Sequence, residues 1–169
     1  IIAGMTDTPE RRNGLEFSNP YYESDMVMLV RKDSKYATAQ GIQDFSGARV
    51  VGQLNTFHDA IIDQINGVNH VTPMKNFPLM IVAVAKNDVD GMVSELPVAL
   101  SAVATNSELT IVKFAQDKGF TTGKDATVSV GVKKGNLELV NQINKALESI
   151  SKEDRNTIMQ DALKRSEVE

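Results

Sequence analysis

Short strand-like and helix-like segments alternate along the whole chain, and this alternation constrains the fold more than any other feature. Residues 26–30 form an apolar run between charged segments, which suits a buried strand. Residues 77–85 are apolar enough for a mostly buried helix. Alternating strands and helices with short connections are typical of α/β architectures, so we expect an α/β fold.

The expected elements follow from periodicity and capping signals. We expect strands at residues 1–3, 26–30, 49–53, 70–72, 89–93, 109–114 and 127–132. We expect helices at residues 56–65, 77–85, 137–150 and 152–165, and helix starts near Thr8-Pro9 and near residues 94–97. Ser151 with Asp154 forms a capping-box-like start for the last helix.

Composition excludes several classes of function. The net charge is −4 and no basic stripe is present, so neither nucleic acid nor an anionic membrane surface is expected as a partner. The chain has no cysteine, which excludes disulfides and thiolate metal sites. With His58 and His70 as the only histidines, we expect no metal and no cofactor. No apolar run approaches the ~20 residues that a membrane span requires.

The first candidate site follows the opening segment. Gly4 leaves a backbone carbonyl approachable at a strand end, Thr6 adds a hydroxyl, and Arg11 lies just inside the next predicted helix. A guanidinium can bind a carboxylate through two parallel hydrogen bonds. The alternative is that Arg11 is an ordinary solvated helix residue.

Two further candidates follow later strands. Thr56 stands at a predicted helix start, where exposed N–H groups suit a carboxylate, or it is a plain N-cap. Glu95 follows the strand at 89–93 and could bind an ammonium group, or it only complements a helix dipole. Together these side chains offer one receptor for a carboxylate and one for an ammonium, as a free α-amino acid requires.

The opening segments also carry a recognisable motif. Residues 1–11 read IIAGMTDTPER and residues 15–22 read LEFSNPYY. This pattern closely resembles the signature of polar-amino-acid-binding proteins of ABC importers, which belong to the solute-binding proteins of family 3 in the type II periplasmic-binding-protein superfamily. Residues 26–30, 43–52, 89–95 and 127–135 resemble later segments of the same family, in the same order.

The resemblance implies a two-lobe clamshell whose second lobe is complete and whose first lobe is partial. Residues 1–25 would form part of lobe 1, residues 26–127 lobe 2 with the hinge strands, and residues 128–169 the C-terminal part of lobe 1. The chain opens abruptly, on the end of a strand, so we expect the first part of the family's domain to be absent. Exposed strand edges in lobe 1 would then favour a swapped or self-associated oligomer, and we expect weak ligand binding or none by the 169 residues alone.

Carried over by position, the family's binding roles fall on residues already singled out. Arg11 would bind the ligand α-carboxylate, and Thr56 would meet the same carboxylate. Thr6 and the Gly4 carbonyl would share the amino group, with Glu95 as its ionic partner. No catalytic residue is implied.

The specificity of the pocket depends on three further positions. Gln53 and Ser94 occupy positions that border the side-chain pocket in relatives, and their neutral polar character favours glutamine, with arginine or another polar amino acid possible. Phe57 replaces a small residue of the family pattern and would line or narrow the pocket.

The implied function is reception of a free L-amino acid and its delivery to a membrane permease. The protein would act at the extracellular face of the cell membrane or in the periplasm, and its C-terminal end resembles a receptor domain anchored or fused to a permease. Two alternatives stay open: an enzyme of the same fold, similar to cyclohexadienyl dehydratase, and a ligand-sensing domain of a membrane receptor. An enzyme would need a general acid or base in the pocket.

Overall fold

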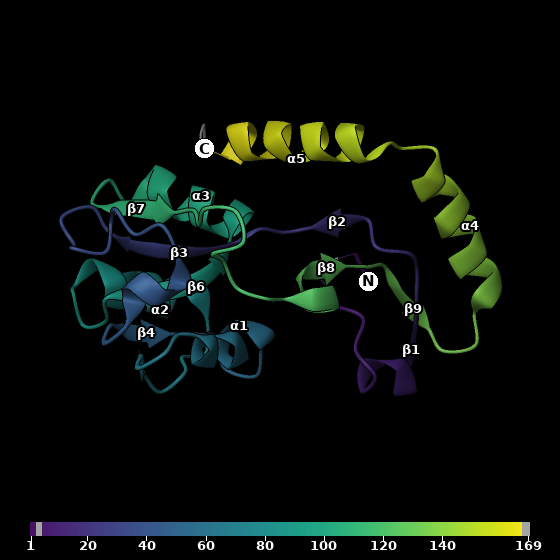
Figure 1. Cartoon of the computed structure of the whole chain (residues 1–169). Coiled ribbons are helices and arrows are strands. Elements are labelled where there is room, and N and C mark those ends of the chain that lie inside the picture. The colour runs from purple at the N-terminus through teal and green to yellow at the C-terminus, as the bar shows by residue number, and fades with distance from the viewer. Residues whose placement is uncertain (3–4, 167–169) are drawn as a thin grey trace. The chain divides into compact units, whose positions relative to one another are not determined.

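The computed structural model describes residues 1–2 and 5–166, with the backbone alone at 124, 125, 163, 164 and 166. The chain divides into two compact units (Figure 1). Unit 1 contains residues 1–24 and 122–168, and unit 2 contains residues 25–121. The α/β prediction is confirmed in both.

Unit 2 is built on a five-stranded sheet with the strand order β5-β4-β6-β3-β7. Its strands are β3 (Met26–Arg31), β4 (Arg49–Val51), β5 (Asn69–His70), β6 (Gly91–Glu95) and β7 (Leu109–Val112). Its helices are η2 (Ile42–Phe45), α1 (Phe57–Ala60), η3 (Ile61–Gln64), α2 (Phe77–Ala85) and α3 (Leu96–Thr105). β4 runs parallel to β5 and β6, whereas β3 is antiparallel to β6 and β7.

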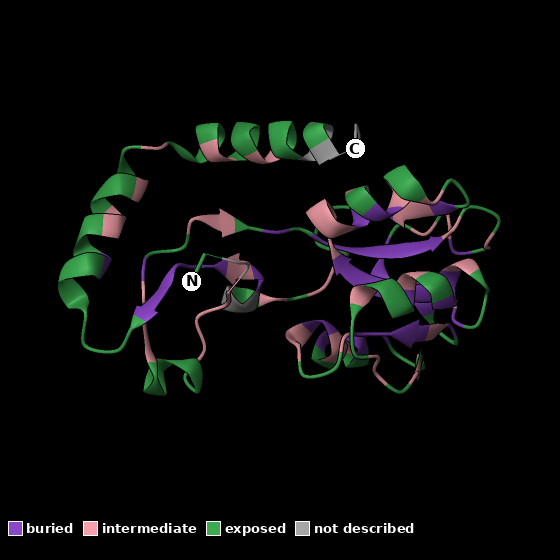
Figure 2. Ribbon diagram, turned by 180° about the vertical axis from the view of Figure 1, so that it is seen from behind, coloured by how far each residue is buried: buried purple, intermediate pink, exposed green. Residues whose placement is uncertain are grey.

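The core of unit 2 forms around β3. Every residue of this strand except Arg31 is buried, which requires cover on both faces of the sheet because successive side chains point to opposite faces (Figure 2). Val27 and Leu29 pack into one cluster with buried residues of α2 and α3. The other buried members of this cluster are Val51, Met80, Ala83, Val84, Val89, Met92, Ala99, Ala102 and Leu109.

Unit 1 has two small antiparallel sheets. β1 (Leu15–Phe17) pairs with β9 (Gly131–Lys133), and β2 (Tyr22–Glu23) pairs with β8 (Thr127–Val128). Its helical segments are η1 (Arg11–Asn13), η4 (Gly123–Ala126), α4 (Leu137–Glu148) and α5 (Lys152–Ser166). A small core of Val130, Val132 and Val140 holds α4 against β9.

Capping residues fix where the last two helices begin. The side chain of Asn136 accepts a hydrogen bond from the Leu139 N–H at 3.3 Å and starts α4. The Ser151 hydroxyl accepts from the Asp154 N–H at 3.0 Å and starts α5, so the predicted capping interaction is confirmed. Arg155 of α5 donates to the Pro20 carbonyl at 3.3 Å, which ties this helix to the segment before β2.

Several predicted elements are shorter than expected, and three of them differ most from the prediction. The helix expected from Thr8 is a turn followed by the three-residue η1, because β1 begins at Leu15. The helix expected at 56–65 divides into α1 and η3, and the tighter geometry of η3 buries both Ile61 and Ile62. The strand expected at 127–132 divides into β8 and β9.

The strand expected at residues 1–3 is absent at the described residues 1–2, and Ala3 lies outside the description. The backbone of Ile1 nevertheless exchanges two hydrogen bonds with Gly131, at 2.7 and 3.0 Å.

Candidate functional site

In unit 1, the segment 6–11 closes into a loop through Arg11. Its guanidinium Nη1 donates to the Thr6 carbonyl at 2.9 Å, and its backbone N–H donates to the Thr8 hydroxyl at 3.3 Å. Arg11 is exposed, and no described carboxylate lies within ion-pair distance of it. The neighbouring Arg12 is paired with Asp7, to which its Nε donates at 2.6 Å. Arg11, unlike Arg12, therefore has a guanidinium that is not already paired with a described carboxylate and can donate hydrogen bonds to a carboxylate from outside. Gly4 lies outside the described residues.

In unit 2, two candidate loops meet at one edge of the sheet. β4 and β6 are parallel neighbours, with Val50 opposite Gly91 and Val51 opposite Met92. Their carboxyl ends therefore lie side by side, and the loop after β4 adjoins the end of β6. Ligands of open α/β sheets bind beyond such carboxyl ends.

The loop after β4 is fixed by backbone contacts. Gln53 forms a parallel bridge with Met74, and its side-chain amide donates to the Lys75 carbonyl at 3.3 Å. Asn55 adopts a left-handed conformation with φ 61°, which turns the chain toward α1. Gln53 is thus half-buried and partly engaged within its own unit.

Thr56 occupies the N-cap position of α1 but does not cap it with its side chain. Its hydroxyl donates instead to the Gln53 carbonyl at 2.7 Å. Since α1 has only four residues, its dipole contributes less at Thr56 than the predicted ten-residue helix would.

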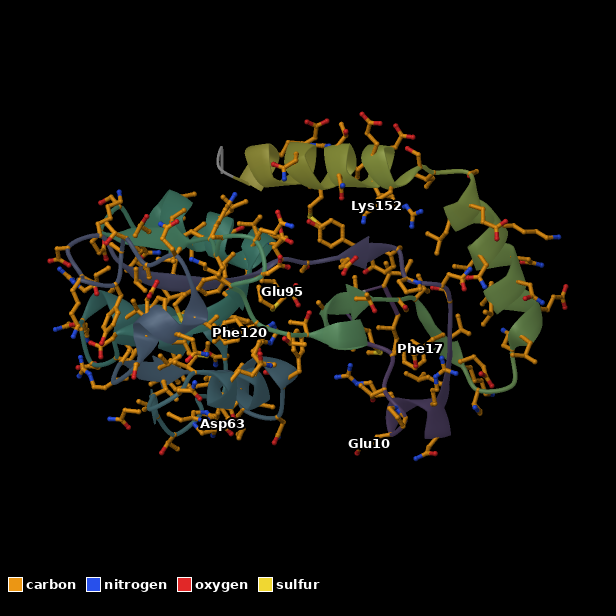
Figure 3. The ribbon with its side chains drawn as sticks, in the orientation of Figure 1. Glu10, Phe17, Asp63, Glu95, Phe120 and Lys152 are labelled. Atoms are coloured by element: carbon orange, nitrogen blue, oxygen red, sulfur yellow. The ribbon has the colours of Figure 1, made fainter. Side chains whose placement is uncertain are left out.

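Glu95 is the last residue of β6 and the N-cap of α3 (Figure 3). Its side chain is 22% exposed, so a ligand at this edge can reach it. The adjacent Ser94 is fully buried, and its hydroxyl donates to the Glu95 carbonyl at 3.1 Å. Ser94 therefore supports the end of β6 from inside the unit.

The structure adds a residue to this edge that sequence reasoning missed. His58 of α1 is buried, and its Nε2 lies 3.5 Å from Oε1 of Glu95. Its Nδ1 lies 3.3 Å from the Thr56 hydroxyl. The ring of Phe57 lies tilted against the imidazole with a centroid separation of 4.2 Å, and Phe77 of α2 meets it edge-on at 5.9 Å. Phe57, which was expected to line the pocket, packs against His58.

The other histidine joins β5 to the helical segment of the same loop. His70 Nδ1 lies 2.8 Å from Asp63 and His70 Nε2 lies 2.9 Å from Asp59. Only a protonated imidazole can donate from both nitrogens. Burial by itself lowers the pKa of His70, but the hydrogen bonds and negative charges of Asp59 and Asp63 outweigh it and raise the pKa above its ordinary value.

This arrangement predicts a pH dependence of stability. The contribution of charged His70 is complete below its unfolded-state pKa of about 6.5 and is lost as pH rises through the higher folded-state pKa. Thermal melts across this range should therefore show the parent chain losing stability relative to His70→Gln as pH rises. If the melting temperatures of the two proteins varied with pH in the same way, a charged His70 bound to Asp59 and Asp63 would be contradicted.

Within the described residues, no group of three or more His, Cys, Asp or Glu is placed to hold a metal ion. None of the described helices combines the length and the apolar character needed to cross a membrane.

Two of the curated proteins similar to this chain are named as amino-acid-binding proteins. A probable histidine-binding protein of Neisseria gonorrhoeae is 27% identical over 157 residues, covering 89% of this chain and 54% of that protein. The ABC transporter arginine-binding protein 1 of Escherichia coli K12 is 26% identical over 152 residues, covering 89% of this chain and 59% of that protein. The chain therefore spans a little over half the length of these curated relatives.

A solved structure confirms the predicted type II periplasmic-binding-protein fold. AbpA of Streptococcus pneumoniae, an amino acid ABC transporter substrate-binding protein bound to L-arginine, superposes with a TM-score of 0.76 at 22% identity. The match covers 98% of this chain and 68% of AbpA. The sequence model of the bacterial extracellular solute-binding proteins, family 3, matches residues 1–162. The chain is thus a member of family 3 of the bacterial extracellular solute-binding proteins.

Proposed function

We propose that this protein is a receptor for a free polar L-amino acid and delivers it to an ABC-type permease. Arg11 of unit 1 binds the α-carboxylate, and Glu95 of unit 2 binds the ammonium group. Thr6 and the Gly4 carbonyl supply further hydrogen bonds to the ammonium group. Thr56 meets the carboxylate only by giving up the hydrogen bond that its hydroxyl donates to the Gln53 carbonyl. The observation that carries the proposal is the placement of Glu95 at the shared carboxyl edge of β4 and β6, in a chain of this family.

The two units correspond, in this proposal, to the two lobes of a binding protein. Unit 2 is complete as a sheet with helices on it, which supports its role as lobe 2. The protein acts at the extracellular face of the membrane or in the periplasm, anchored or fused to its permease. Binding energy then selects the liganded conformation, which the permease recognises.

Selection among amino acids falls to Gln53 and Phe57. Both are half-buried, whereas the Ser94 side chain is fully enclosed within unit 2. A neutral amide beside an aromatic ring suits a polar side chain, so we propose glutamine as the first ligand to test. Arginine and histidine are the next ligands to test, because two relatives are named for these amino acids.

We also propose that the protein is not an enzyme. His58 beside Glu95 is the acid–base pair that a same-fold enzyme would need, but the His58 side chain is only 8% exposed. A general acid or base must come within hydrogen-bond reach of its substrate. An imidazole enclosed by Phe57 and Phe77 does not meet that requirement.

A screen of all twenty L-amino acids tests the proposal. Calorimetry measures binding, and NMR amide shifts detect it even when affinity is in the millimolar range. We expect one polar amino acid to produce saturable shifts near both Arg11 and Glu95. An absence of heat and of shifts with every amino acid, in a chain extended to the length of its relatives, would contradict the receptor function.

A further inference from the structure

The hydrogen bonds around His58 determine which of its ring nitrogens carries hydrogen. The Gln53 carbonyl can only accept, so the Thr56 hydroxyl donates its hydrogen to it at 2.7 Å. The oxygen of Thr56 is then left as an acceptor for His58 Nδ1 at 3.3 Å. In this network the His58 Nδ1 carries a hydrogen.

With hydrogen on Nδ1, a neutral His58 would have an unfavourable contact between its second nitrogen and Glu95. In a neutral imidazole, Nε2 would be an acceptor, yet it faces the carboxylate oxygen of Glu95 at 3.5 Å. Nε2 is buried and has no hydrogen-bond partner among the described residues. A proton on Nε2 converts this repulsive contact into a charge-assisted one, which is stronger in a buried site than in water.

No other described charge competes for this position. The aromatic neighbours Phe57 and Phe77 are apolar and keep the imidazole from turning away. Asp59, the next residue of α1, is hydrogen-bonded to His70 at 2.9 Å. Glu95 is thus the titratable group recorded within ion-pair distance of His58 in the described part of the chain.

We propose that His58 is a positioning residue for Glu95 and that binding of an amino acid at Glu95 releases a proton from His58. In the unliganded chain the protonated imidazole faces the carboxylate. An arriving ammonium group neutralises the same carboxylate, His58 loses its counter-charge, and the Nε2 proton passes to solvent. The inference rests on the proposed function, because it requires the ligand's ammonium group to bind Glu95.

Proton release is measured by calorimetry of the full chain with L-glutamine and L-arginine in two buffers of different ionisation enthalpy. We expect a net release of protons on binding, and affinity that increases with pH. His58→Gln should release none, and its remaining affinity should not vary with pH. His70→Gln, which alters the other histidine, should release as many protons as the parent. Equal release by His58→Gln and the parent would overturn the inference.

A double-mutant cycle tests the contact without ligand. Melting temperatures of His58→Gln, Glu95→Gln and the double variant should be non-additive at acidic pH and closer to additive at alkaline pH. Additive losses at every pH would overturn the positioning role. Binding without proton release would contradict this inference alone, whereas a chain that binds neither amino acid would contradict the proposed function together with proton release.

Discussion

Replacing Gly52 with alanine should destabilise unit 2 by about 3 kcal/mol or prevent it from folding. A methyl group at Gly52 would lie 2.4 Å from Cα and 2.7 Å from the backbone nitrogen of Asp59. These are backbone atoms of α1, so no side chain can turn away to make room. Gly52 therefore allows α1 to pack directly against the end of β4, which places Thr56 and His58 at the candidate site.

Thermal or denaturant unfolding measures this effect, and Gly14→Ala is the matched control. Nothing lies within 4 Å of a methyl group at Gly14, where φ is −113° and alanine is tolerated. We expect Gly14→Ala to unfold like the parent. A Gly52→Ala protein as stable as the parent would show that α1 does not pack this closely on β4.

Removing either proposed charge partner of the ligand should cost about 2 kcal/mol of binding, or about thirtyfold in Kd. Arg11→Ala leaves the ligand carboxylate without its guanidinium, and Glu95→Ala leaves the ammonium without its counter-charge. The lower end of the usual range applies because Arg11 is exposed in the unliganded chain.

Two other charges, one in each unit, serve as controls for this prediction. Arg12→Ala removes an exposed guanidinium that is already paired with Asp7, and Glu108→Ala removes an exposed carboxylate of unit 2. Both should bind as the parent does when measured by calorimetry. Equal losses from all four variants would indicate a general charge effect and contradict specific roles for Arg11 and Glu95.

The parts of the fold that sequence predicted well are those with strong local signals. The apolar run at 26–30 became the buried β3, and the helix expected at 77–85 was found at those residues. The helix expected at 56–65 was wrong in extent because its apolar spacing does not distinguish α-helical from 3-10 geometry. The left-handed Asn55 and the tight contact at Gly52 place that segment, and both depend on tertiary packing.

The candidate site was predictable only in part. Arg11 stood out as a charged residue at the start of a predicted helix, and Glu95 as a charged residue at the end of a predicted strand. His58 did not, because its proximity to Glu95 depends on β4 and β6 being parallel neighbours, and no local pattern reveals that pairing. A buried histidine beside two aromatic residues resembles ordinary core packing in the sequence.

The proposed function requires Arg11 and Glu95 to bind opposite ends of one amino acid. The most direct test measures, by calorimetry, the affinities of the parent, Arg11→Ala and Glu95→Ala for the bound amino acid, its carboxamide and its des-amino analogue. We expect that Arg11→Ala no longer distinguishes the amino acid from its carboxamide, and that Glu95→Ala no longer distinguishes it from the des-amino analogue. Discrimination as strong in both variants as in the parent would contradict this expectation.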